Sequence, residues 1–114
     1  FTEIGMFSAV EVSKDSVVVR SRALDYLLNL REKFSIPGKP VHLKGRDYQW
    51  RIHVSKDRFA QIVFDLASDI DYGNFKERIG HDDRSRAIAY GSVWSAMRDF
   101  GDIKFDEDQF YEIR

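Results

Sequence analysis

The 114-residue chain contains no cysteine. This absence excludes a disulfide framework, a thiol nucleophile and a thiolate metal site. It also fits a reducing compartment. No apolar run approaches ~20 residues, the length that crosses a bilayer, and no signal peptide is visible. We therefore expect no membrane partner.

The common catalytic motifs are missing as well: there is no nucleophile elbow, phosphate loop, dinucleotide fingerprint or zincin motif. An enzyme without cysteine would have to use His, Asp or Lys, and no pair of these has a spacing that argues for acid–base work. We therefore expect no catalytic residue, no cofactor and no metal ligand, and favour a non-enzymatic protein over an enzyme. The net charge of −1 is lower than a non-specific nucleic-acid binder usually carries.

Apolar and aromatic residues are plentiful by contrast. Hydrophobic residues make up 43% of the chain, and nine Phe, five Tyr and two Trp predict an aromatic-rich core. The length fits one domain. We assign residues 1–101 to a single α+β domain and residues 102–114 to a C-terminal tail, either a docking strand or a partly mobile segment.

The clearest pattern is an amphipathic helix that follows Ser55 and is expected to end near Gly73. Ser55 is placed to cap its first turn, and Gly73 can provide a left-handed exit. Apolar residues at helical spacing form one wide stripe, which predicts a helix packed on a sheet. The stripe comprises Phe59, Ile62, Val63, Leu66, Ala67 and Ile70.

Strand patterns occur at residues 1–12, 17–20, 41–44 and 48–54, the first of them with a bend near Gly5 as an alternative. Further helices are expected after a cap at Ser21, over residues 75–79, and from a cap at Asp82 or Asp83 to a stop at Gly101. Gly91 in the last helix predicts close approach of another backbone. Short turns between strands require antiparallel pairing. The fold class is therefore α+β: an antiparallel sheet of about four strands in ββαββα order, with helices on one face and an extra C-terminal helix.

Several stretches together resemble one family: IGMFSAV, VVVRSRALDYLLNL, DYQWRIHV, IDYGNFK at residues 70–76 and YGSVWSAM at residues 90–97. They resemble a family of small, mostly uncharacterised bacterial proteins, including phage-borne ones. The resemblance covers roughly residues 4–100, and IDYGNFK is its most specific part. It implies a cytoplasmic single-domain α+β protein and brings no activity, cofactor or site residue.

The alternation in residues 48–54 places Tyr48, Trp50 and Ile52 toward the helices, so the residues between them face outward. The same parity in the preceding strand adds two residues, and Arg20 can join from a neighbouring strand. The resulting candidate ligand face comprises His42, Lys44, Gln49, Arg51 and His53. It predicts a cationic patch for phosphate, nucleotide or nucleic acid; a solvated or self-covered sheet face is the alternative.

Three further candidates have plain structural alternatives. Tyr72, Asn74 and Lys76 form a candidate pocket rim, or they hold their loop together. The run from His81 to Arg84 joins imidazole with carboxylates, which either cap a helix or form an acid–base or metal site. The last helix carries an aromatic stripe that is either core or a contact for a dimer or partner, completed by the tail aromatics.

Taken together, these patterns favour a small binding or regulatory domain that acts through protein–protein contact, including as a homodimer. The alternative is a phosphate, nucleotide or nucleic-acid binder that uses the cationic sheet face. A third hypothesis is an enzyme with a His/Asp site near His81.

Overall fold

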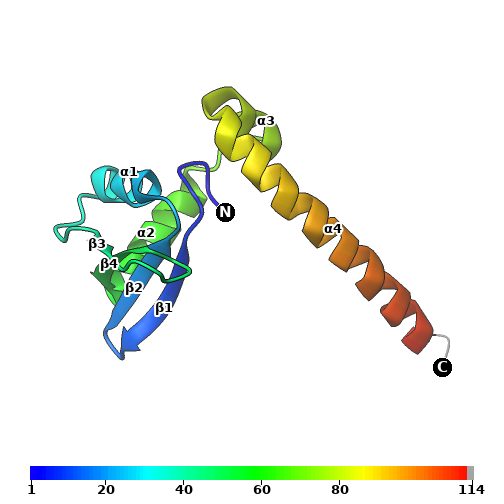
Figure 1. Ribbon diagram of the computed structural model, residues 1–114, viewed down its shortest axis with the longest axis horizontal. Helices are drawn as coiled ribbons and strands as arrows, with labels where there is room; N and C mark the ends of the chain where they lie inside the picture. The colour runs from blue at the N-terminus through cyan, green and yellow to red at the C-terminus, as the bar shows by residue number, and fades with distance from the viewer. Residues whose placement is uncertain (113–114) are drawn as a thin grey trace. The chain divides into compact units, whose positions relative to one another are not determined.

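The computed structural model describes the backbone of residues 1–112 and the side chains of residues 1–80 and 83–104. It contains a four-stranded antiparallel sheet and four helices, which confirms the α+β class and the extra C-terminal helix (Figure 1). The chain divides into two compact units, Phe1–Asp71 and Tyr72–Arg114. The single domain expected over residues 1–101 stays a prediction.

The sheet lies entirely in the first unit. Its strands are β1 (Ser8–Ser13), β2 (Ser16–Ser21), β3 (Val41–His42) and β4 (Trp50–Ser55). They are arranged in the order β1-β2-β4-β3, and each neighbouring pair is antiparallel. The short connection between β1 and β2 forms a hairpin, as expected for antiparallel strands joined by a short turn.

Two helices, α1 (Leu24–Phe34) and α2 (Lys56–Ser68), pack against one face of this sheet. Alternate residues of the two central strands point into the core, where β-branched side chains pack well. Ile52 of β4 and Ile62 of α2 are fully buried. The whole cluster comprises Val17, Val19, Leu27, Leu30, Phe34, Ile36, Ile52, Val54 and Ile62.

The two helix caps predicted in this unit have different outcomes. Ser55 caps α2 as expected, because its Oγ accepts a hydrogen bond from the Arg58 backbone N–H at 3.1 Å. The cap at Ser21 is wrong, because α1 has its N-cap at Ala23. Ser21 is fully buried at the end of β2, where its hydroxyl donates to the Met6 carbonyl at 3.1 Å and accepts from the Ala23 N–H at 3.4 Å. Although Ser21 precedes a helix, it does not act as the N-cap, and its hydroxyl instead makes a tertiary hydrogen bond to the segment before β1.

The strand predicted from residue 1 begins only at Ser8. Residues 1–7 turn instead, with a bridge between Thr2 and Gly5, which agrees with the alternative of a bend near Gly5. Gly5 has φ +152°, and a Cβ on it would lie 2.6 Å from a ring carbon of Tyr26. Ile4 and Phe7 then pack against the core. Contact with α1 therefore decides the path of this segment.

The predicted stripe of α2 is correct at its centre and wrong at its edges. Phe59, Ile62 and Leu66 contact the core, but Val63 is 48% exposed, Ala67 is exposed, and Ile70 lies beyond the helix end at Ser68. Arg58 is partly buried in their place. Its Nη2 donates to the Phe34 carbonyl at the end of α1, and this bond draws a polar residue toward α1.

The second unit is built from α3 (Phe75–Asp82) and α4 (Arg84–Glu112). Asn74 caps α3 through its Oδ1, and Asp83 accepts from the Arg86 N–H at the start of α4. Three aromatic side chains, Phe75 of α3 with Tyr90 and Trp94 of α4, pack with ring centres 6.0 Å apart.

Two glycine predictions for α4 are wrong. The helix continues through Gly101, so residues 102–112 are helical and contain no docking strand. Residues 113–114 of the predicted tail lie outside the described residues. No other backbone among the described residues approaches Gly91, because a Cβ on it would meet no described atom within 4 Å apart from the nearby backbone of its own helix. Helical residues on both sides of each glycine outweigh its low helix propensity.

Candidate functional site

The outer face of the sheet carries the cationic residues that the alternation in β4 predicted. Ile52 and Val54 are buried under the helices, at 0% and 6% exposure, so Arg51 and His53 lie on the opposite face. His53 is exposed and Arg51 partly so. Arg20 of β2 is the cross-strand partner of Arg51, which confirms that it joins this face.

The prediction that Tyr48 faces the helices is wrong, because Tyr48 lies just before β4 and its ring contacts arginines of the outer face. The guanidinium of Arg20 lies 4.6 Å from the centre of its ring, and that of Arg22 lies 4.7 Å away. Nε of Arg51 donates to the Tyr48 carbonyl at 3.4 Å. Arg22 also makes two hydrogen bonds, of 3.0 and 3.1 Å, to the carboxylate of Asp47, and these raise the pKa of Arg22 above its usual value.

His42 does not belong to this face. It is the cross-strand partner of Trp50, and paired residues of an antiparallel ladder point to the same side. The two rings stack with centres 4.2 Å apart, and Nε2 of His42 lies 3.0 Å from Oε1 of Gln49. The predicted parity fails because β3 has only two residues, and Lys44 lies in the exposed loop that follows. Two of the five predicted residues, Arg51 and His53, thus share the outer face.

The three residues of the predicted pocket rim have separate contacts. Asn74 caps α3, and Tyr72 packs against Phe75 at 5.7 Å between ring centres. Lys76 lies over the ring of Trp94 at 5.0 Å. A shallow pocket of about 380 Å³ includes Lys76 and Trp94 among its lining residues but neither Tyr72 nor Asn74. The rim residues therefore do not converge on one pocket.

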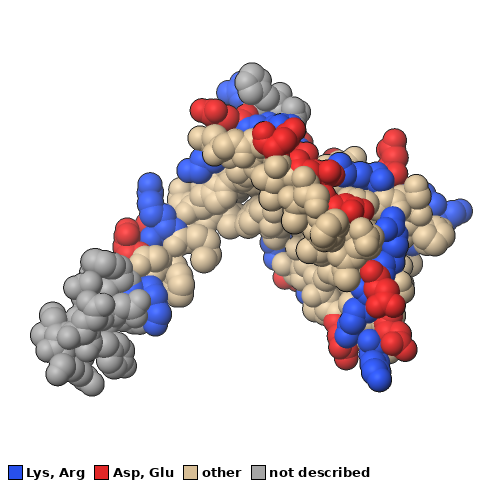
Figure 2. All heavy atoms as spheres, turned by 180° about the vertical axis from the view of Figure 1, so that it is seen from behind, with Lys and Arg blue, Asp and Glu red and all other residues tan. Residues whose placement is uncertain are grey.

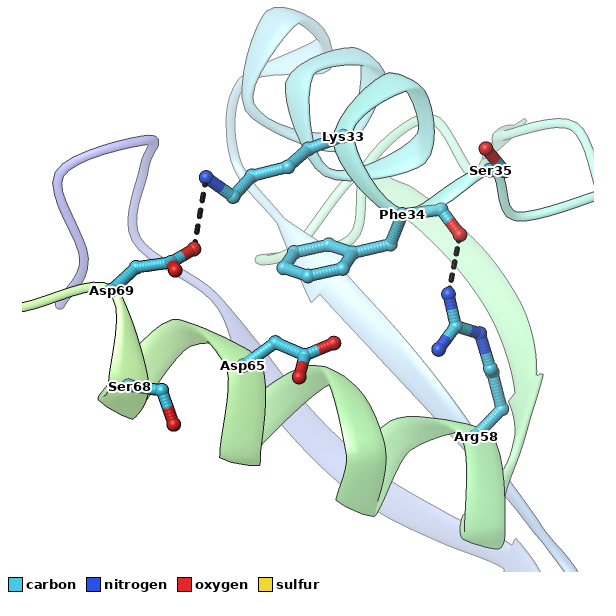
Figure 3. A pocket seen from close by; sticks show the side chains of 7 residues that line it. All are labelled: Lys33, Phe34, Ser35, Arg58, Asp65, Ser68 and Asp69. Atoms are coloured by element: carbon cyan, nitrogen blue, oxygen red, sulfur yellow. Dashed lines mark hydrogen bonds and ion pairs between the residues drawn. The ribbon is translucent and has the colours of Figure 1, made fainter.

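A second pocket, of about 520 Å³, lies between the end of α1 and α2 (Figure 3). Its charged groups have partners within the first unit: Lys33 Nζ lies 3.2 Å from Asp69, and Arg58 Nη2 donates to the Phe34 carbonyl at 2.6 Å. Asp65 accepts from Gln61 at 3.0 Å. These internal bonds tie α1 to α2, so the pocket has a structural explanation.

The most conspicuous surface feature is an apolar stripe on α4, which we call the α4 stripe. Its residues follow one another at alternating steps of four and three along the helix: Ala89, Val93, Ala96, Phe100 and Ile103. All five are exposed, with Phe100 at 57% and Ile103 at 60%. Figure 2 shows uncharged side chains along much of this helix. Sequence reasoning placed only the Tyr90–Trp94 side of the helix and missed this second stripe, although its spacing was visible.

No group of three or more His, Cys, Asp or Glu side chains that could hold a metal ion occurs in residues 1–80 and 83–104. Within the part of the chain that the structure describes, no helix is both long and apolar enough to cross a membrane. The side chains of His81 and Asp82, which carried the third hypothesis, lie outside the described residues.

Comparison of the chain with protein-family models, curated proteins and solved structures gives no match. The resemblance to small bacterial proteins stays a prediction.

Proposed function

We propose that this chain is a non-enzymatic, cytoplasmic protein-contact domain that acts as a homodimer, with α4 of one copy packed along α4 of a second. The observation that carries the proposal is the exposed α4 stripe. Apolar residues at alternating steps of three and four are the pattern by which two helices wind around each other, each side chain inserting between four of the partner. A surface helix with nothing to cover would not need this repeat.

The size of the second unit supports a second copy as the occupant. Chains near ~40 residues rarely bury enough surface to be stable without disulfides, metals or association. Cysteine is absent from the chain, and among the described residues of this unit only Ile79 and Tyr90 are buried apolar side chains. Covering the α4 stripe would supply the missing core.

The charges beside the stripe favour a parallel pair. If Val93 and Phe100 are the first positions (a) of two successive heptads, Asp99 is the last position (g) of the first heptad and Lys104 is the fifth position (e) of the second. In a parallel dimer those two positions face each other across the interface, in both directions by symmetry. An antiparallel pair centred between Ala96 and Phe100 would instead bring Asp99 near its own copy. The parallel arrangement therefore pairs opposite charges.

Sedimentation equilibrium tests the proposal. The unmodified chain should have twice the mass of one copy, and Phe100→Glu should shift it to the mass of one copy, because a carboxylate in the stripe would be buried without a partner. Ser95→Glu, which adds the same charge on another side of α4, is the matched control and should stay dimeric. A monomeric unmodified chain, or equal effects of both variants, would contradict the proposal.

The absence of cysteine makes the orientation directly testable. In a parallel, in-register pair the two copies of Ala96 face each other, within the ~7 Å between Cα atoms that a disulfide can bridge. Ala96→Cys should therefore form a covalent dimer under mild oxidation, and Ser95→Cys should not. If the dimer exists but Ala96→Cys fails to crosslink, the parallel arrangement is wrong.

A further inference from the structure

The outer face of the sheet carries a cluster of three arginines that the dimer proposal does not use. We call Arg20, Arg22 and Arg51, with Tyr48 between them, the arginine cluster. Two guanidinium groups lie within 4.7 Å of the Tyr48 ring centre, and the third donates to its backbone carbonyl. Three cations held against one residue repel one another and raise the free energy of the folded chain unless a negative charge opposes theirs.

Little in the described part of the chain opposes that charge. Arg20 and Arg51 are direct cross-strand partners, an arrangement that destabilises a sheet when both residues have the same charge. Among the described residues, the one carboxylate bonded to the cluster is that of Asp47, and both of its oxygens accept from Arg22. The cluster therefore has an excess of about two positive charges.

The cluster also has hydrogen-bonding capacity left over. Arg20 donates from Nη2 to the Ser8 hydroxyl at 2.8 Å, but its Nε is buried and has no partner within the described residues. The terminal nitrogens of Arg51 make no hydrogen bond or ion pair within that same part of the chain. Guanidinium groups present several donors in a planar fork that matches the oxygens of a phosphate.

We propose that the arginine cluster binds the phosphate group of a small phosphorylated molecule. A phosphate dianion would balance the excess charge and accept from the terminal nitrogens of Arg51 in the geometry that guanidinium groups favour. Single-stranded nucleic acid fits less well, because it needs exposed aromatic rings for its bases. The Tyr48 ring is already in contact with Arg20 and Arg22, and the His42–Trp50 stack lies on the opposite face.

Isothermal titration calorimetry with inorganic phosphate, at low ionic strength, tests the site. The unmodified chain should bind, and added salt should weaken the binding. Arg51→Gln should reduce the affinity about tenfold or more, since it removes a charged donor pair. Lys14→Gln, in the exposed β1–β2 turn, removes the same charge elsewhere and should change the affinity less than about twofold.

Asp47→Asn gives a result that a purely structural role would not produce. It removes the carboxylate that occupies Arg22, so phosphate should bind more tightly. Adenosine monophosphate should bind about as well as phosphate, whereas binding of an oligothymidylate alone would indicate a nucleic-acid surface and overturn the proposal. Absence of phosphate binding, or an equal loss in Lys14→Gln, would also overturn it. None of these outcomes bears on the α4 dimer, because sedimentation measures the oligomeric state independently.

Discussion

The two units of this chain differ in how large a buried core their apolar side chains form. In Phe1–Asp71, two helices close over a sheet and nine apolar residues form one buried cluster. In Tyr72–Arg114, the short α3 covers only one side of α4, and five large apolar residues of α4 are exposed: Ile88, Val93, Met97, Phe100 and Ile103. A helix alone cannot bury two stripes, so the second unit is where an additional partner would add most stability.

Each unit contains one of the two tryptophans, Trp50 in β4 and Trp94 in α4. Trp50 packs against the core of the first unit, and Trp94 lies in the aromatic cluster of the second. Urea denaturation followed by fluorescence can therefore report each unit separately, with Trp94→Phe or Trp50→Phe as the background chain. Chain concentration must be held constant, because self-association adds to apparent stability.

The largest expected effect is in the core of the first unit. Ile62→Ala should lower the free energy of unfolding reported by Trp50 by about 2–5 kcal/mol, because it leaves a cavity at a fully buried position. Val63→Ala, one residue along α2 and 48% exposed, should change it by less than about 0.5 kcal/mol. Equal effects of the two variants would show that the buried face of α2 is misplaced.

A smaller effect is expected at the start of the second unit. Asn74→Ala should lower the free energy of unfolding reported by Trp94 by about 1 kcal/mol, because the Glu77 N–H loses its acceptor. Asn74→Ser keeps an acceptor at the same position and should retain most of the stability. If the Trp50 curve moves as much as the Trp94 curve, the two units unfold together and the contrast between them is wrong.

The sequence was sufficient for the fold where a local pattern and the tertiary contacts agree. The alternation through Arg51, Ile52, His53 and Val54 gave the faces of β4 correctly, and the hydroxyl of Ser55 gave the start of α2. Residues 1–7 and Ser21 show the limit. Their paths depend on contacts with α1 and with each other, which no local pattern encodes.

The candidate site was predicted less completely for a related reason. Parity within one strand placed Arg51 and His53, but the face of His42 depends on the register between β3 and β4, which a single sequence does not fix. Tyr48 was wrongly predicted to face the helices, and Arg22 was not recognised, because their contact joins the end of β2 to the loop before β4. The α4 stripe was readable from spacing alone, but the stronger aromatic signal on the other side of the helix obscured it.

The smallest expected effect is that of Gly91→Ala, and the same substitution at Gly5 of the first unit is its comparison. Gly91→Ala should stabilise the second unit by roughly 0.5–1 kcal/mol, because a Cβ at this helical position meets no described atom within 4 Å and alanine favours the helix. Gly5→Ala should instead destabilise the first unit, because its φ of +152° and the Tyr26 ring 2.6 Å away leave no room for a side chain. Opposite shifts in the Trp94 and Trp50 curves would support a first unit that is tightly packed and a second that has space around α4. A loss of stability in Gly91→Ala would instead show that something packs closely against α4 at that position.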